Sequence, residues 1–554
     1  MNVFKPMLFS SLKHYSKKQF IGDIIAGIIV AIIALPLSIA LALASGVGPE
    51  QGLYTAIIAG FLISFFGGST VQIAGPTAAF ATIVAGIVAT SGMDGLIVAT
   101  IIAGILLILM GIFKVGTLIK FIPSTITTGF TAGIAVTILV GQFKDFFGIT
   151  YAAGVRPIET MEKIFAFIEH ANTINVMAVV VGVVCLLVQI VWPKVSKTVP
   201  SSLIAVIVGI LMVKVLGLHV NTIGDLYTIS NSLPHFTFPH LSFELINSQF
   251  SNGMVIAILA AIESLLSCVV ADGMVGTKHR SNTELIAQGI GNIGSALFGG
   301  IPATGAIART AANIKNGGRS PIAGMVHAVT LVFILVLLMP YAAWIPMPTI
   351  AAILFMVAYN MCQWRSFVKF CKIAPKSDLV VLFLTFFLTI VFDLVVAIEV
   401  GMIVTCVLFV KRISDETNVL SWQEDDNQTA QDLRKIPRSI RVYEISGPLF
   451  FGASEILDHI TIGGHTKSLI IRMRSVPSMD LTSIIALEEI ITGCQKHGVQ
   501  VIFSHINEQP YHALDKAGIL DKVGKENVVE NINVALAKAK EHVLIDSMDT
   551  LFDY

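Results

Sequence analysis

The chain has 554 residues, of which 55% are hydrophobic and only 13% are charged, and its mean hydropathy is +0.81. These values exclude a soluble globular protein and predict a chain that lies mostly in a membrane. The 36 basic and 36 acidic side chains cancel, and we expect no nucleic-acid partner.

Apolar stretches of about 20 residues recur from residue 21 to 410, each long enough to cross the hydrocarbon core of a bilayer. Polar residues become frequent after residue 412. We therefore expect a cytoplasmic segment (1–20), a transmembrane domain (21–412), a linker (413–436), a small soluble domain (437–545) and a tail (546–554). The expected segments number about fourteen and start near residues 21, 52, 76, 95, 120, 172, 199, 252, 283, 303, 321, 345, 378 and 394.

The distribution of Lys and Arg sets the expected orientation. The N-terminal segment is basic, and alternation from there puts Lys278 with Arg280, and Arg365 with Lys369, in loops on the same side. The stretch 218–252, predicted to lie on the other side, has no Lys or Arg. Because cytoplasmic loops carry the excess of basic residues, both termini are predicted to be cytoplasmic.

Two stretches echo each other across the membrane domain. Phe66-Gly67-Gly68 is followed by residues 75–79 (GPTAA), and Phe298-Gly299-Gly300 is followed by residues 302–306 (PATGA). Ala34-Leu35-Pro36 matches Ala261-Ile262-Glu263 at nearly the same spacing. We interpret these echoes as two repeats, about 21–216 and 252–411, and an odd number of spans per repeat inverts the second one. The alternative is chance similarity between membrane helices that contain Gly and Pro.

Gly, Pro and Thr interrupt each echoed segment, which predicts helices that start inside the bilayer, near Thr77 and Thr304. Such a start exposes N–H groups and the positive end of the helix dipole, and this favours an anion. Both Thr side chains are expected to cap these starts and to donate to the anion. The alternative is close helix packing through small residues. The residues predicted to contact the anion are Gly75, Pro76, Thr77, Ala78, Ala79, Thr304, Gly305 and Ala306.

Three further positions carry charge or polarity in apolar segments. Arg309 is expected to attract the anion, and the alternative is an Arg that reaches lipid phosphate. Glu263 is expected to bind the coupling proton, since burial favours the neutral carboxyl group; the alternative is a permanent pair with Arg309. Ser267, one turn later, is expected to share the proton or to ligate Na⁺. Asp272 is interpreted as structural and Asp23 as a helix N-cap.

Pro36 occupies the position that corresponds to Glu263 in the other repeat, so the repeats differ where one of them carries a charge. Leu37, Ser38 and Leu41 are predicted to line the same cavity.

These residues resemble the SulP (sulfate permease) family of anion transporters. The matching stretches are residues 34–40, 75–78, 261–267 and 301–310, and the resemblance extends from about residue 15 to 545. It implies an all-α membrane domain with a seven-plus-seven inverted repeat and elevator-like movement. It further implies substrate held between the third and tenth segments, a cytoplasmic α/β STAS domain that supports a homodimer, and a bacterial cytoplasmic (inner) membrane.

The family transports sulfate, bicarbonate, chloride, oxalate and C4-dicarboxylates. Members with Glu at the position of Glu263 resemble proton-coupled carriers, whereas sodium–bicarbonate members tend to have Asp there and Thr at the position of Ser267. Ala308 stands where some relatives have Ser, so that substrate contact is not carried over. The prediction is a secondary active transporter for sulfate or a related anion, with H⁺ as the coupling ion and no cofactor. The alternatives are a sodium-coupled bicarbonate or C4-dicarboxylate symporter, an uncoupled exchanger or channel, and a membrane-anchored signalling module.

The soluble part alternates predicted strands (438–445, 468–473, 499–504) with predicted helices (454–460, 481–494, 533–542), as in a small α/β domain. Asp480, Thr482 and Ser483 open a helix after a strand. In STAS domains that resemble anti-sigma antagonists this turn is phosphorylated or contacts a nucleotide or protein partner; a plain helix cap is the alternative. The sequence contains no phosphate loop, metal cluster or nucleophile–base motif, so neither a metal site nor an enzyme is expected.

Overall fold

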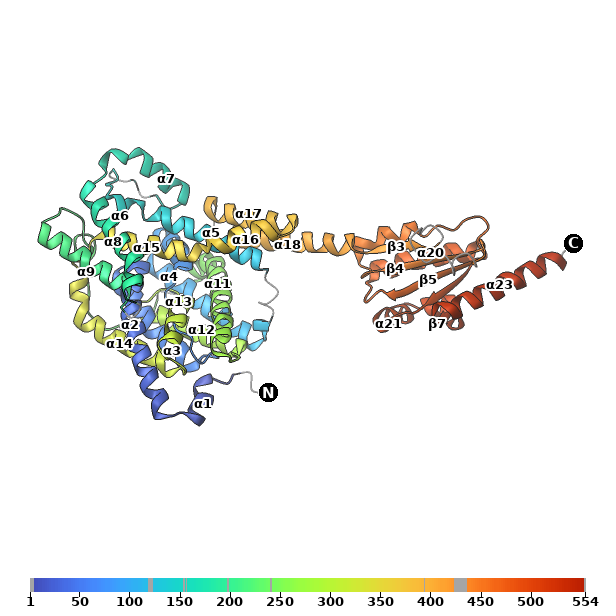
Figure 1. Ribbon diagram of the computed structural model, residues 1–554, viewed down its shortest axis with the longest axis horizontal. Helices are drawn as coiled ribbons and strands as arrows, with labels where there is room; N and C mark the ends of the chain where they lie inside the picture. Colours follow the sequence, from blue (N-terminus) through green and yellow to red (C-terminus); the bar gives the residue numbers. More distant parts are fainter. Residues whose placement is uncertain are drawn as a thin grey trace. The chain divides into compact units, whose positions relative to one another are not determined.

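The computed structural model describes residues 4–117, 123–152, 155, 157–196, 199–239, 242–392, 394–422 and 436–552 (Figure 1). Most of the linker expected at 413–436 and the last two residues of the expected tail lie outside these ranges. The chain divides into two compact units, Met1–Met402 and Ile403–Tyr554.

The first unit is helical, and its helices match the predicted apolar segments. The half that corresponds to the first repeat contains α1 (Met7–Ser11), α2 (Lys17–Ala44), α3 (Pro49–Phe66), α4 (Ala81–Ile112), α5 (Ser124–Gly141), α6 (Phe143–Phe147), α7 (Thr160–Glu169), α8 (Val176–Val195) and α9 (Ser201–Leu216). A short helix, α10 (Ile223–Leu226), precedes the second half, which contains α11 (Phe243–Val275), α12 (Ser281–Leu297), α13 (Ile307–Lys315), α14 (Ile322–Ala342), α15 (Met347–Cys362), α16 (Trp364–Ile373), α17 (Lys376–Val391) and α18 (Leu394–Asp415).

Two predicted segments are joined in α4. Gly92 has φ 66° and ψ −167°, values outside the helical region, and it separates residues 81–91 from residues 93–112. A glycine is suited to this position because it has no Cβ to clash at positive φ. The first part is short because its polypeptide reaches the membrane interior as extended chain, and α13, with nine residues, repeats that pattern in the second half.

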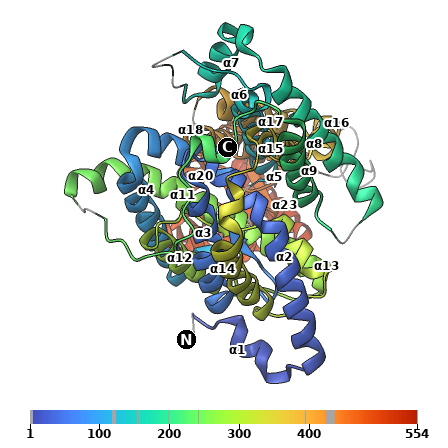
Figure 2. The same cartoon turned by 90° about the vertical axis from the view of Figure 1, so that its left-hand side faces the viewer.

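The helices pack in two groups, which are called the core group and the gate group. In the core group α4 packs against α11 and α12, and α14 packs against α2 and α3 (Figure 2). In the gate group α5 packs against α15 and α17, and α8 packs against α9 and α15. Glycines allow close approach: a Cβ added at Gly27 of α2 would lie 2.6 Å from the carbonyl oxygen of Ala323 in α14.

The outer surface of the first unit is apolar. Within the described residues, seven helices combine at least 18 residues with the hydropathy of a membrane span. Leu337 of α14 is 64% exposed and Phe387 of α17 is 56% exposed, as expected for side chains that face lipid.

Asp23 does not cap α2, contrary to the sequence interpretation. Ser16 is the N-cap and accepts a hydrogen bond from the Gln19 amide, whereas Asp23 lies one and a half turns inside the helix and is buried. Its carboxylate accepts hydrogen bonds from the Arg319 amide (2.7 Å) and from the Tyr15 hydroxyl (2.6 Å). Asp23 therefore joins α2 to the loop between α13 and α14, a partner that spacing along the chain does not reveal.

The second unit is a five-stranded mixed sheet in the order β3-β4-β5-β6-β7, with α20 (Leu481–Lys496), α21 (Glu508–Lys516) and α22 (Ile519–Val523) on one face and α23 (Ile532–Phe552) on the other. β3 pairs antiparallel with β4, and the other neighbours are parallel. β3 lies within residues 413–436, the range expected to be linker. This short polar strand forms because antiparallel pairing with β4 provides its hydrogen bonds. The strands are β3 (Asn418–Ser421), β4 (Ile440–Ser446), β5 (Ser468–Ser475), β6 (Gln500–Ser504) and β7 (Val528–Val529).

Cys494 provides a test of this packing. It lies in the last turns of α20 and faces the apolar core, and burial raises the pKa of its thiol to about 11. At pH 8 we expect about 100-fold less thiolate than for an ordinary cysteine. A maleimide should therefore label Cys494 at least about 100-fold more slowly in the folded protein than in urea, as measured by mass spectrometry of its peptide. Equal labelling rates in the two states would contradict the burial.

Candidate functional site

The two interrupted segments meet as a pair of short strands. β1 (Ala74–Gly75) pairs antiparallel with β2 (Thr304–Gly305), with Ala74 opposite Gly305 and Gly75 opposite Thr304. The Ala306 amide continues the pairing by donating to the Ile73 carbonyl at 2.8 Å. This pairing satisfies extended backbone inside the membrane domain, which only burial in protein or contact with water permits. The α13 helix begins directly after β2, and α4 begins after β1 and one 3₁₀ turn (Ala78–Phe80).

Glu263 of α11 lies between the two strands. Its Oε2 accepts hydrogen bonds from the hydroxyls of Thr77 (3.0 Å) and Thr304 (3.3 Å). The Thr304 hydroxyl also lies 3.0 Å from the Gly305 carbonyl oxygen, so these two acceptors share its single proton. One carboxylate thus contacts the helix start of each repeat, which places the predicted ion-coupling residue at the predicted anion site.

The predicted side-chain caps are absent. Thr77 occupies the N-cap position of the 3₁₀ turn but makes no capping bond, and the N-cap of α13 is Ala306 rather than Thr304. Both hydroxyls donate to Glu263 instead. The amides of the first helical turns therefore receive no side-chain acceptor from these residues, and the positive ends of both helix dipoles stay directed at the strand pair.

The predicted anion-site residues differ in their exposure to solvent. Thr77 and Glu263 are partly exposed, whereas Gly75, Pro76, Ala79 and Thr304 are buried. Ala78 and Ala306 are nearly buried. An anion that approaches the helix starts thus first meets the hydroxyl of Thr77 and the carboxylate of Glu263.

Arg309 is not paired with Glu263, so the permanent pair considered above is not formed within the described residues. Arg309 is 3% exposed, and its Nη2 donates to the Pro76 carbonyl at 2.5 Å. Its Nη1 is buried without a hydrogen-bond partner among the described groups. Arg309 thus lies behind β1, from where its charge adds to the positive field of the helix starts without direct exposure. The lipid-facing alternative is wrong.

Gly75 leaves no room for a side chain between β1 and Arg309. A Cβ at Gly75 would lie 2.3 Å from Arg309 Nη1, so alanine must displace the buried guanidinium or β1. We expect Gly75→Ala to raise the KM for the transported anion by about tenfold, the equivalent of about 1.4 kcal/mol. Gly86→Ala in α4 is the control, because nothing lies within 4 Å of its added Cβ. Saturation curves of uptake into proteoliposomes measure both; equal KM values would contradict the packing.

Ser264 and Ser267 fasten α11 to β2 and α13. The Ser264 hydroxyl accepts from the Gly305 amide at 3.1 Å, and the Ser267 hydroxyl donates to Thr310 Oγ1 at 3.4 Å. Thr310 also accepts from the Ile73 amide at 3.0 Å. Ser267 is fully buried and one turn below Glu263, so its described contact is with α13. Ser264 was missed in the sequence because a serine beside a carboxylate gives no signal of what its hydroxyl contacts.

A second buried carboxylate, Glu284 of α12, was also missed. It is 1% exposed and accepts four hydrogen bonds. The donors are the Gly68 amide (2.8 Å), the Ser69 amide (3.3 Å), Gln72 Nε2 (2.8 Å) and Gln288 Nε2 (2.9 Å). Three of these donors belong to the segment that leads from α3 into β1, so Glu284 positions the strand at the site. Glu284 lies in the first turn of α12, where acidic residues are common because they favour the helix dipole, so the sequence did not single it out.

α2 carries Leu37, Ser38 and Leu41, which were predicted to line the same cavity. α2 packs against α13 and contacts α4. Ser38 and Leu41 are buried and Leu37 is partly exposed. The Ser38 carbonyl oxygen lies 2.1 Å from where a Cβ at Gly52 of α3 would stand. No hydrogen bond joins these three side chains to Glu263 within the described residues.

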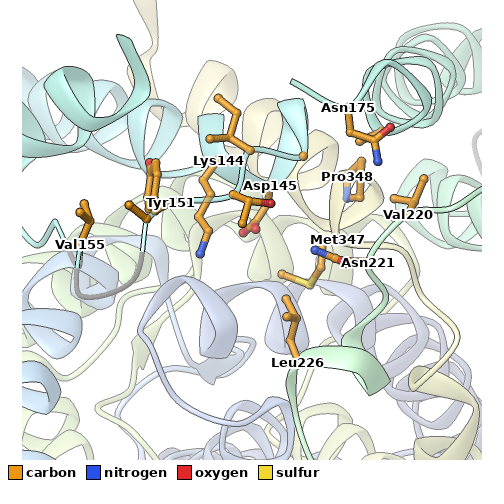
Figure 3. Close-up of a pocket in the computed structure, with 15 residues that line it drawn as sticks. Lys144, Asp145, Tyr151, Val155, Asn175, Val220, Asn221, Leu226, Met347 and Pro348 are labelled. Atoms are coloured by element: carbon orange, nitrogen blue, oxygen red, sulfur yellow. The ribbon is translucent and has the colours of Figure 1, made fainter. Parts of the chain in front are cut away.

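A separate cavity of about 360 Å³ lies in the gate group, between α6 and the start of α15 (Figure 3). Lys144 and Asp145 lie side by side at it, with Tyr151 beyond the lysine and Met347 on the opposite side. Its lining contains none of the residues predicted to bind the anion. The presence of one side chain of each charge favours no ligand class.

The turn predicted to be regulatory in the soluble unit forms a helix cap. Asp480 accepts from the Ser483 amide (2.9 Å) and from the Phe451 amide (2.8 Å). Ser483 is fully buried, whereas Thr482 is exposed. A modifying enzyme therefore reaches Thr482 in the folded domain but not Ser483.

Comparisons with known proteins agree with this architecture. The model of the sulfate permease family matches residues 20–385, and the STAS domain model matches residues 432–537. The chain belongs to the sulfate permease family. It is 40% identical to YvdB of Bacillus subtilis, provisionally named a sulfate transporter, over 95% of this chain and 99% of that one. It is 29% identical to the bicarbonate transporter BicA of a Picosynechococcus strain, over 94% of each chain.

Two solved structures support the fold of this sulfate permease family member. Murine Slc26a9, an anion transporter in the inward-facing state, aligns with a TM-score of 0.87 over 97% of this chain and 94% of that one, at 18% identity. The transmembrane domain of cyanobacterial BicA aligns with a TM-score of 0.63 over 69% of this chain and 98% of that domain, at 26% identity. The protein is thus an anion transporter of this family, and the relatives are transporters rather than enzymes. The predicted helical membrane domain with a STAS domain is confirmed.

Proposed function

We propose that this protein takes up sulfate or a related anion together with protons. The observation that carries the proposal is the position of Glu263 Oε2 between the hydroxyls of Thr77 and Thr304. An ionised Glu263 occupies both hydroxyls and repels an incoming anion. A proton on Glu263 removes that charge and leaves both hydroxyls able to donate to the anion.

The proton and the anion then favour each other's binding. By linkage, an anion that binds more tightly to the protonated protein raises the affinity for the proton by the same factor. A carrier that moves only when both are bound, or neither is, couples the two gradients. The helix starts and Arg309 supply the positive field for the anion, and Glu263 supplies the coupling.

The division into core group and gate group supports an elevator-like movement. The strand pair, Glu263, Arg309 and Glu284 all belong to elements of the core group, so the site can move as one body against the gate group. We propose that both termini are cytoplasmic in the inner membrane of a bacterium, and that the protein forms a homodimer. We further propose that the exposed Thr482 beside Asp480 is where a protein or nucleotide partner regulates the STAS domain.

Uptake into proteoliposomes tests the coupling. Labelled sulfate, bicarbonate and succinate are supplied with an inward proton gradient, with no gradient, and with an inward Na⁺ gradient at equal pH. We expect accumulation of one anion above equilibrium only with the proton gradient. Accumulation driven by Na⁺ alone would favour the sodium-coupled alternative, in which Ser267 contributes a ligand. Saturable uptake without accumulation under any gradient would favour an uncoupled exchanger or channel.

A further inference from the structure

We propose that α16 binds anionic phospholipid headgroups at the cytoplasmic surface of the membrane. The sequence of α16 is WRSFVKFCKI, and a lysine stands three residues after its end. Arg365, Lys369 and Lys372 are spaced by four and three residues, so they form one line along α16, and Lys376 follows as the first residue of α17. These four residues are called the basic stripe.

The backbone sets α16 apart from the helices before and after it. Gln363, in the left-handed region with φ 42° and ψ 43°, ends α15 and turns the chain. Pro375 begins α17, and the residue before it is extended, as proline requires. α16 is therefore a separate helix between the apolar helices α15 and α17. Trp364, 48% exposed at its first position, is the residue type that concentrates at membrane–water interfaces.

The apolar side of α16 already has a partner within the protein. Phe367 contacts Phe383 and Phe386 of α17, with ring centroids 5.9 and 5.5 Å apart, and α16 also packs against α5. Figure 1 shows α16 beside α17. The opposite side carries the basic stripe, and all four of its residues are exposed.

The acid nearest to the stripe in the sequence is Asp378, in the first turn of α17. The sequence has no Asp or Glu between residues 285 and 377. None of the ion pairs among the described residues includes a residue of the basic stripe. Three cations on an interfacial helix and a fourth at the start of the next helix attract the anionic lipids of the cytoplasmic leaflet, each by roughly a factor of five. The same charges favour a cytoplasmic position for α16.

Quenching of Trp364 by brominated lipids measures the lipids beside α16. The full chain has four tryptophans, and Phe at 192, 344 and 422 leaves Trp364 alone. The protein is reconstituted in bilayers of brominated phosphatidylglycerol with unlabelled phosphatidylcholine, and in the reverse mixture. We expect about threefold to fivefold preference for phosphatidylglycerol, falling to about one when the four stripe residues are changed to Gln.

Two controls keep the experiment decisive. Gln at Lys194 and Lys214, exposed lysines elsewhere in the membrane unit, should leave the preference unchanged. Addition of about 1 M salt, where the Debye length is about 3 Å, should remove it without any mutation. Equal quenching by the two lipids in the parent protein would overturn the proposal. A preference that emerges only after residues 413–554 are deleted would also overturn it, because the chain's own acidic segments would then cover the stripe.

Discussion

Glu263→Gln is expected to abolish anion accumulation driven by a pH gradient while it leaves anion exchange largely intact. The glutamine keeps the size of Glu263 and can accept from Thr77 and Thr304, but it binds no proton in the physiological range. For one proton per monovalent anion, each pH unit sustains an accumulation of up to about tenfold, since about 1.4 kcal/mol corresponds to a factor of ten. The variant should show a ratio near one. Counterflow of labelled anion between equal pH values should stay within a few fold of the parent rate.

The control for this result lies on the same helix. Glu244, in the first turn of α11, is exposed and far in sequence from the strand pair. Glu244→Gln makes the same chemical change and should accumulate the anion as the parent protein does. If Glu263→Gln retained accumulation driven by the proton gradient, Glu263 would not be the coupling residue, whatever its hydrogen bonds.

Glu284→Ala is expected to have the largest effect on stability. It leaves four buried donors without their acceptor, from Gly68, Ser69, Gln72 and Gln288. Each unsatisfied buried donor costs about 1–3 kcal/mol, and partial relaxation leaves a net loss of about 3 kcal/mol or more. A thermal midpoint in detergent, followed by size-exclusion fluorescence, should fall by about 4 °C or more.

Glu284→Gln separates the loss of hydrogen bonds from the loss of volume. Its carbonyl oxygen can still accept from part of the donor set, so its midpoint should lie between those of the parent protein and of Glu284→Ala. Glu244→Ala, an exposed substitution, should change the midpoint little. An unchanged midpoint for Glu284→Ala would mean that the segment before β1 is held by other contacts.

Several features of the site were predictable because they are local. Gly, Pro and Thr near residues 76 and 304 break an apolar helix wherever they occur, and a lone Glu in the segment 252–275 is conspicuous in a sequence with few membrane charges. The duplication of the break predicted that the two helix starts meet. The antiparallel pairing of Gly75 with Thr304 confirms that they do.

Other features required the tertiary structure because they depend on which groups face each other across the core. The sequence alone determined the membrane class, the repeats, the residues of the helix breaks and the sign of the substrate, since hydropathy and chain geometry act over a few turns. Only the fold decided that both Thr hydroxyls donate to Glu263 rather than cap helices, that Arg309 lies behind β1, and that Glu284 holds the segment before it. Hydrogen-bond partners more than 200 residues apart in sequence, such as Glu284 and Gly68, come together only when the two repeats pack, so no local pattern records them.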